Sequence, residues 1–84
     1  MSEKLGDRSL PKEVFKIVED QLVVGRSSGP GKAFEETRLK FSDVSDDEIR
    51  NAIHALMVAQ ILVFTLDGTF RIIGSLENLP SHMT

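Results

Sequence analysis

Residues 45–73 have the sequence SDDEIRNAIHALMVAQILVFTLDGTFRII. Ser45 followed by Glu48 is a capping-box pattern, in which the serine oxygen accepts a hydrogen bond from the first turn and the glutamate binds the serine's own amide. Apolar residues then recur at helical spacing until Ile61, where extended, β-prone residues begin. The helical row is Ile49, Ala52, Ile53 and Leu56. The stretch therefore predicts a capped helix that continues directly into a β-hairpin.

Asp67-Gly68 supplies the turn of the expected hairpin, because this dipeptide favours two-residue loops. Such a loop pairs Leu66 with Thr69. One face of the hairpin then carries Leu62, Phe64, Leu66 and Ile73, and the other carries Val63, Phe70 and Ile72. A two-stranded wing has only one face to lay on its own helices. We therefore expect some of these apolar side chains to remain available to a partner or to a second copy of the chain.

Two further helices are expected ahead of this stretch. Leu10-Pro11 begins the first, since proline suits the first helical position, and apolar residues follow at positions 14, 15, 18 and 22. Residues 25–31, GRSSGPG, form a loop. Residues 32–41 give a second short helix, and residues 42–44 give a turn in which Val44 is the hydrophobic staple before the Ser45 cap.

The order of these elements predicts an α+β fold, a winged helix-turn-helix with three helices followed by a β-hairpin wing. Residues 10–74 form this winged-helix domain. Residues 1–9 and 75–84 show no periodicity and are expected to be disordered tails. A chain of 84 residues makes one domain with a single modest core.

Composition narrows the classes of function. Hydrophobic residues make up 40% and charged residues 27% of the chain, with no apolar run of membrane-spanning length. Because the chain has no cysteine and its N-terminal residues lack the pattern of a secretory signal, we expect an intracellular protein, cytoplasmic or nuclear. The 10 basic and 13 acidic side chains give a net charge of −3, whereas proteins held to nucleic acid through phosphates are usually basic over the docking face.

The sequence contains no motif for catalysis or for a cofactor. Gly31-Lys32 has the ending of a phosphate-binding P-loop, but Arg26 stands at the position of its first glycine and Ala33 at that of its serine or threonine. His54 and His82 have no ligand partners at metal-site spacing. No serine or threonine is set up as a nucleophile. We therefore expect neither an enzyme nor a bound metal or cofactor.

Carboxylates gather around the start of the third expected helix, at Asp43, Asp46, Asp47 and Glu48. There they complement the positive end of the helix dipole, each by roughly 0.3 to 1 kcal/mol. In a DNA-reading winged helix this end enters the major groove beside phosphates, which carboxylates repel. Dipole stabilisation is one explanation of these charges, and a preference for a basic partner is the other.

Residue types in this helix and hairpin resemble those of two winged-helix families. The pattern similar to bacterial repressors of the GntR kind is Val44-Ser45, Ile49-Arg50, Ala52-Ile53, Leu56, Ile61-Leu62 and Gly68-Thr69-Phe70. Residues 10–73 are also similar to the C-terminal winged helix of the middle subunit of replication protein A, in helix lengths, in the glycine- and proline-containing loop and in the acidic hairpin turn. The first resemblance implies binding of duplex DNA. The second implies binding of basic amphipathic helices from replication and repair proteins.

Three functions are open from the sequence. The leading hypothesis is a docking module in DNA transactions (replication, repair or transcription control) that receives a basic helical segment of a partner protein through Asp46, Asp47, Leu62, Phe64, Leu66, Asp67 and Ile73. The alternative is a small transcriptional regulator, acting as a homodimer, that reads duplex DNA through Lys32, Arg38, Arg50, Asn51, His54 and Arg71. A purely structural subunit of a larger assembly is the third.

Overall fold

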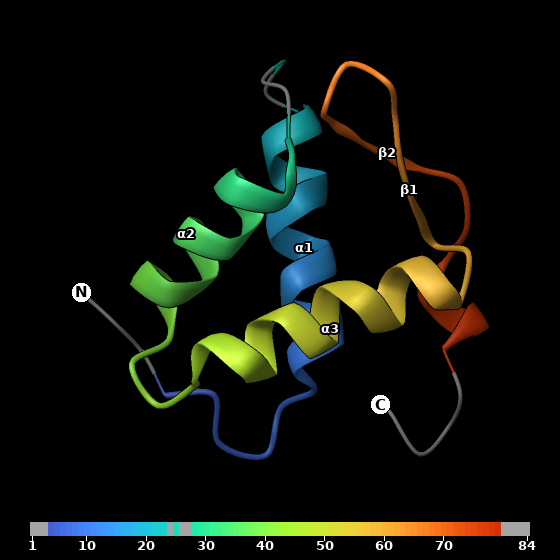
Figure 1. The fold of residues 1–84 in the computed structure, drawn as a ribbon. Helices are drawn as coiled ribbons and strands as arrows, with labels where there is room; N and C mark the ends of the chain where they lie inside the picture. Colours follow the sequence, from blue (N-terminus) through green and yellow to red (C-terminus); the bar gives the residue numbers. More distant parts are fainter. Residues whose placement is uncertain (1–3, 24, 26–27, 80–84) are drawn as a thin grey trace.

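Three helices followed by a hairpin make up the chain in a computed structural model that describes residues 4–23, 25 and 28–79. The elements are α1 Leu10–Val23, α2 Pro30–Lys40, α3 Asp46–Val58, β1 Leu62–Phe64, β2 Phe70–Ile72 and a short 3₁₀ helix, η1 Leu76–Asn78. The predicted α+β layout is therefore confirmed. In Figure 1, α3 crosses α1 and the hairpin follows the C-terminal end of α3. The predictions for residues 1–3, for Arg26 and for residues 80–84, which include His82, lie outside the described residues.

A single core lies where the three helices and the hairpin meet. α1 contributes Val14 and Val18, and α3 contributes Ile49 and Leu56, all fully buried. The cluster also takes in side chains from the rest of the helices and from the segments around them: Leu10, Phe15, Ala33, Phe41, Ala52, Ile53, Ile61, Leu62, Phe70 and Leu79. Each of the side chains larger than alanine stabilises the fold by about 1.5–3 kcal/mol through its removal from water. The apolar row expected for α3 is thus the row that faces the core.

The capping box of α3 is present as predicted. The Ser45 Oγ accepts a hydrogen bond from the Glu48 amide at 3.2 Å, and the Ser45 amide donates to Glu48 Oε1 at 3.1 Å. Val44, immediately before the cap, packs against the core as the expected staple. The helix start is therefore held by local hydrogen bonds and by one apolar contact.

We expect Ser45→Ala to lower the free energy of unfolding by about 1 kcal/mol, because the Glu48 amide then loses its side-chain acceptor. Urea denaturation followed by circular dichroism measures this loss. Ser45→Asp, which keeps an acceptor at the cap, is the matched control and should stay close to the wild type. A wild-type midpoint for Ser45→Ala would show that the cap adds nothing to stability.

The register of the hairpin differs by one residue from the prediction. The pairs are Leu62↔Ile72, Val63↔Arg71 and Phe64↔Phe70. The Thr65 amide donates to the Thr69 carbonyl at 2.8 Å, so the loop is residues 66–68 rather than the Asp-Gly dipeptide alone. Gly68, with φ of 82°, takes the left-handed position that closes such a longer loop.

This shift redistributes the apolar side chains of the hairpin. Residues directly opposite each other share a face, so the inner face carries Leu62, Phe64, Phe70 and Ile72. The predicted faces, one with Leu62, Phe64, Leu66 and Ile73 and the other with Val63, Phe70 and Ile72, are therefore wrong. A one-residue slip moves a side chain to the opposite side of a strand, and the inner face then supplies Leu62 and Phe70 to the core.

The hairpin is fastened at both of its ends. The Phe70 amide donates to the Ser28 carbonyl at 2.6 Å, which joins β2 to the segment before α2. A Cβ at Gly29 would lie 2.8 Å from the Gly68 carbonyl oxygen, so only glycine allows this approach of the hairpin tip. At the other end the Ile73 amide donates to the Ile61 carbonyl. Helix α2 begins at Pro30, earlier than the predicted residue 32, with the proline in its first turn.

Residues 4–9, within the expected N-terminal tail, make contacts with the body of the protein. The Asp43 carboxylate accepts hydrogen bonds from the Leu5 amide at 2.7 Å and from the Gly6 amide at 3.4 Å. Arg8 forms a salt bridge with the buried Glu13, 3.3 Å away. This segment is held by hydrogen bonds and a salt bridge. Such polar contacts leave no apolar periodicity in the sequence, so the pattern did not predict them.

The described part of the expected C-terminal tail also packs on the domain. Residues 76–78 form η1, and Leu79 is buried in the core cluster. Leu79 is a single apolar residue after a 3₁₀ turn, so it forms no repeat with its neighbours. Apolar periodicity therefore could not indicate that it is buried. Contacts with the core therefore continue past residue 74 as far as Leu79.

Asp43 gives the N-terminal turn a predictable pH dependence. The Leu5 amide is the main cause that lowers the pKa of Asp43 below its ordinary value of 3.8, with the Gly6 amide adding to it. A lowered folded pKa means that the contribution is complete above 3.8 and is lost as pH falls through the lowered pKa. We expect the Leu5 and Gly6 amide resonances to lose their folded positions only in that acidic range, as nuclear magnetic resonance can measure. Asp43→Asn should remove this transition; a transition that remained would have another origin.

Candidate functional site

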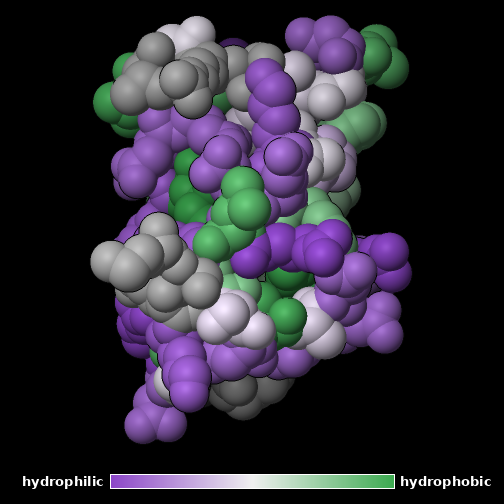
Figure 2. Space-filling model, turned by 90° about the vertical axis from the view of Figure 1, so that its left-hand side faces the viewer, coloured by the Kyte–Doolittle hydropathy of each residue, from purple (hydrophilic) through white to green (hydrophobic). Residues whose placement is uncertain are grey.

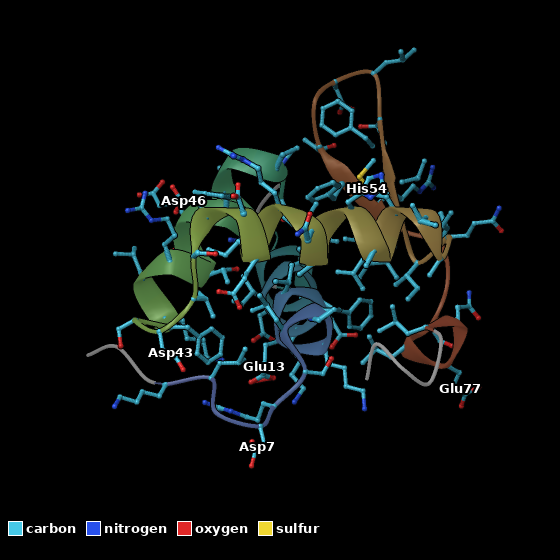
Figure 3. The ribbon with its side chains drawn as sticks, turned by 60° about the horizontal axis from the view of Figure 1, so that its bottom comes forward. Asp7, Glu13, Asp43, Asp46, His54 and Glu77 are labelled. Carbon is cyan, nitrogen blue, oxygen red and sulfur yellow. The ribbon has the colours of Figure 1, made fainter. Side chains whose placement is uncertain are left out.

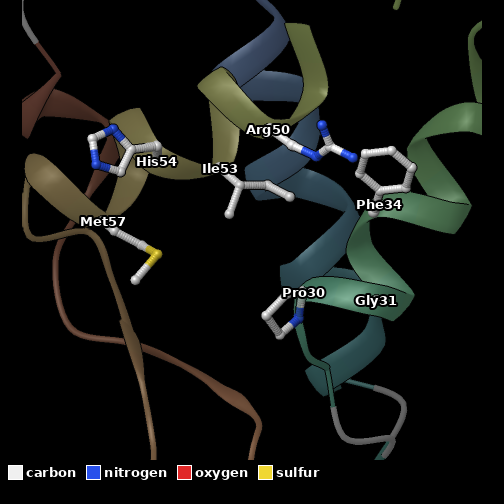
Figure 4. Close-up of a pocket in the computed structure, with 7 residues that line it drawn as sticks. All are labelled: Pro30, Gly31, Phe34, Arg50, Ile53, His54 and Met57. Atoms are coloured by element: carbon white, nitrogen blue, oxygen red, sulfur yellow. The ribbon is translucent and has the colours of Figure 1, made fainter. Parts of the chain in front are cut away.

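A groove of about 480 Å³ lies between α2 and α3. Its lining residues are Pro30, Gly31 and Phe34 from α2, and Arg50, Ile53, His54 and Met57 from α3. Figure 4 shows Ile53 and Met57 projecting from α3 toward Pro30 in the first turn of α2. The lining positions on α3 are spaced three and four residues apart, so they form one stripe of the helix. The groove is apolar along its length, with Arg50 and His54 as its polar side chains.

Phe34 is the aromatic wall of this groove, and two arginines lie over it. The guanidinium carbons of Arg38 and Arg50 are 5.9 and 5.8 Å from the centre of its ring. Arg38 also reaches across to α3, where its Nε lies 3.4 Å from Asp46 Oδ1. Arg50 Nη1 lies 3.3 Å from Asp47 Oδ1 on its own helix. Each pair is at least half exposed, so its worth is at most about 1 kcal/mol.

The predicted DNA-contacting residues lie on two parts of the surface. Arg50, Asn51 and His54 are exposed on α3, and Lys32 and Arg38 are exposed on α2. Arg71 is exposed on β2, on the hairpin face opposite to Phe70. The structure therefore brings Arg38 and Arg50 together beside Phe34, with His54 on the same groove. Asn51 lies beside the start of α1, and Arg71 lies on the outer face of the hairpin.

Carboxylates share the side of α3 with these basic residues. Asp46 and Asp47 lie in its first turn, and Figure 3 shows Asp46 at one end of α3 and His54 further along the helix. Glu48 follows them and is exposed. Two pairs of opposite charge stand beside the groove wall Phe34, Arg38 with Asp46 and Arg50 with Asp47. Lys32 is exposed on α2, and Glu48 belongs to the capping box at the start of α3.

The predicted partner-binding residues do not form one continuous surface. Asp46 and Asp47 lie at the start of α3 and the hairpin begins after its end, so about 20 Å of helix separates them. Leu62, with 2% of its surface exposed, belongs to the core. Phe64 at 47%, Ile73 at 55% and the fully exposed Leu66 remain on the surface, but the observed register divides them between the inner face, the turn and the chain beyond β2.

Asp67 is bound within the hairpin turn rather than directed at a partner. Its carboxylate accepts hydrogen bonds from the hydroxyls of Thr65 and Thr69. The Thr65 hydroxyl is the main cause that lowers the pKa of Asp67 below its ordinary value. This residue stabilises the loop while it also places a negative charge at the tip.

Sequence reasoning missed the groove because its residues were assigned elsewhere. Ile53 was assigned to the core row and Arg50 and His54 to DNA contacts, while Phe34 and Met57 were assigned to no site. Met57 is more than one third exposed and Val58 two thirds exposed. One side of the groove can be found in the sequence, because Arg50, Ile53, His54 and Met57 form a stripe on α3. The other side, on α2, depends on how the two helices pack against each other.

Apolar side chains also reach the surface outside the groove. Figure 2 shows the side of the molecule that faces left in Figure 1, where hydrophilic residues surround separate hydrophobic areas. Leu39 on α2 and Val23 at the end of α1 are both largely exposed. These scattered residues do not need a functional explanation, whereas a lined groove does.

Two absences apply to the described part of the chain. Among residues 4–23, 25 and 28–79, no group of three or more histidine, aspartate or glutamate side chains is placed to hold a metal ion. No helix in these ranges is both long and apolar enough to cross a bilayer. Comparison with known protein families, curated proteins and solved structures finds no match for this chain.

Proposed function

We propose that this chain is a non-catalytic winged-helix module of DNA transactions that docks a basic amphipathic helix of a partner protein. The helix lies in the groove between α2 and α3, and the apolar lining of that groove is the observation that carries the proposal. Phe34, Ile53 and Met57 supply the wall and floor against which an apolar stripe packs. The assignment to DNA transactions rests on analogy with winged-helix domains.

The groove suits a helix in size and shape. Recognition of a helix in a groove uses apolar anchors at i, i+3 or i+4, and i+7, which a stripe on one helix presents in a row. The hollow, of about 480 Å³, is as large as a small-molecule pocket of roughly 300–1,000 Å³, which leaves room for apolar side chains to enter. Several apolar anchors of one helix can therefore be buried there together.

The charge of the protein favours a basic partner over a phosphate backbone. The net charge of −3 attracts a cationic segment, and Asp47, whose side chain is 86% exposed, lies beside Arg50 at one end of the groove. Phosphate binding needs a surplus of cations on the docking face, whereas here Arg38 and Arg50 are each paired with a carboxylate, Asp46 and Asp47. Basic residues of the partner thus meet Asp47, while its apolar stripe meets the groove.

Reading of duplex DNA is the second candidate function. The exposed Arg50, Asn51 and His54 on α3 favour it, since side chains of this helix contact base edges in DNA-binding winged helices. Against it stand the two salt bridges that already engage Arg38 and Arg50.

Selection from two display libraries tests the docking function. Both contain helical peptides with a randomised apolar stripe, one on a lysine-rich background and the other on a glutamate-rich background. We expect the immobilised protein to enrich peptides from the lysine-rich library with a common stripe. Enrichment from neither library, or from the glutamate-rich library alone, would overturn the proposal.

A titration with random-sequence duplex DNA separates the second candidate. Salt-steep binding at low micromolar concentration would favour the regulator, because phosphate contacts release counterions. We expect weak binding by the wild-type chain.

A further inference from the structure

Arg38 and Arg50 are oriented together on the exposed side of the helix-turn-helix. Both guanidinium groups lie over the ring of Phe34, one from α2 and one from α3. Guanidinium groups bind phosphate oxygens through paired hydrogen bonds, so two of them beside one aromatic ring offer contacts to phosphates. A carboxylate of the same protein nevertheless lies within 3.4 Å of each of them.

We propose that Asp46 and Asp47 mask a duplex-DNA-binding face built on Arg38 and Arg50. Asp46 occupies the guanidinium of Arg38, and Asp47 occupies that of Arg50, where phosphate oxygens would otherwise bind. The chain thus carries a winged-helix nucleic-acid surface that its own carboxylates hold in an inactive form. The docking function and this inference share Arg50 and Asp47 at one end of the groove. They differ in the ligand, because docking depends on the apolar lining and this inference on the two arginines.

Duplex DNA is the ligand that fits the masked face. α3 follows the turn after α2 and exposes Arg50, Asn51 and His54 along its outer side. A helix presented in this way has the width of the major groove, while cations on the preceding helix lie at the level of the flanking phosphates. Arg38 on α2 holds that second position, and Lys32 is exposed on the same helix.

Removal of the two carboxylates changes charge without changing size. Asp46→Asn with Asp47→Asn keeps side-chain volume and keeps residues suited to the start of a helix. The change frees two guanidinium groups and removes two negative charges from the face that DNA approaches. We expect the double variant to bind a random-sequence duplex at least about tenfold more tightly than the wild type at about 50 mM salt, with a steeper loss of affinity toward about 200 mM.

The matched control separates unmasking from a simple change in net charge. Glu19 and Asp20 are exposed on α1, and Glu19→Gln with Asp20→Asn alters the net charge by the same amount. We expect this control to bind the duplex as weakly as the wild type. A second control adds Arg38→Gln and Arg50→Gln to the Asp46→Asn, Asp47→Asn variant, and this should abolish the gain.

Fluorescence anisotropy with the labelled duplex measures all four proteins, and circular dichroism verifies that each is folded. The proposal stands if only the Asp46→Asn, Asp47→Asn variant binds tightly. It is overturned if the wild type binds equally tightly, if the α1 control gains as much affinity, or if the gain survives loss of both arginines. Each of these results leaves the peptide selection unaffected, so the two proposals fail separately.

Discussion

Leu56→Ala is expected to lower the free energy of unfolding by about 2–5 kcal/mol. Leu56 is fully buried in α3 and belongs to the cluster that joins the helices to the start of the hairpin. Truncation removes its transfer free energy and leaves a cavity that rigid neighbours cannot fill. A domain of this size has only about 5–15 kcal/mol of stability, so a large share is lost.

Urea denaturation followed by circular dichroism measures this loss of stability. Leu39→Ala on α2 is the matched control, because Leu39 is 63% exposed and its truncation should change stability by no more than about 0.5 kcal/mol. If the two variants unfolded at the same urea concentration, the packing described for α3 would be wrong.

Met57→Asp is expected to abolish binding of the peptides selected on the wild-type chain. Met57 lines the groove between Ile53 and the hairpin side, where a carboxylate would be buried by the docked helix without a partner. Anchoring contacts of this kind carry about 2–4 kcal/mol of binding, so affinity should fall by at least about 30-fold. The side chain is more than one third exposed in the free protein, and the fold should therefore persist.

Val58→Asp is the control for this effect. Val58 is the next residue of α3, is more exposed than Met57, and does not line the groove. We expect it to retain peptide binding. Phe64→Ser with Leu66→Ser tests the hairpin in the same assay: loss of binding in that variant, with binding intact in Met57→Asp, would move the docking surface from the groove to the hairpin.

Local patterns predicted much of the fold. The capping box needs only Ser45 and Glu48, three residues apart, and the apolar row of α3 follows from helical periodicity. Both were confirmed because no distant contact competes with them. The hairpin was located correctly, but its register was not, since Gly68 can close either a two-residue or a longer loop and the pairing of Leu62 with Ile72 depends on the core.

The candidate site depends on contacts between helices that the sequence does not encode locally. Phe34 becomes a groove wall only when α2 packs beside α3, and the pairing of Arg38 with Asp46 joins residues from two elements. The charges of these residues were recognised, but their mutual neutralisation was not. The sequence also could not predict that Asp43 holds the N-terminal turn or that Leu79 is buried. Neither residue belongs to a repeating apolar pattern.

Amide chemical-shift mapping tests the docking function most directly. The ¹⁵N-labelled protein is titrated with a basic amphipathic peptide selected on the wild-type chain. We predict the largest shifts at Phe34, Ile53 and Met57, with smaller shifts at Asp47 and little change in α1. Shifts confined to residues 63–66 and 71–73, with the groove residues unchanged, would contradict the assignment of the partner to the groove.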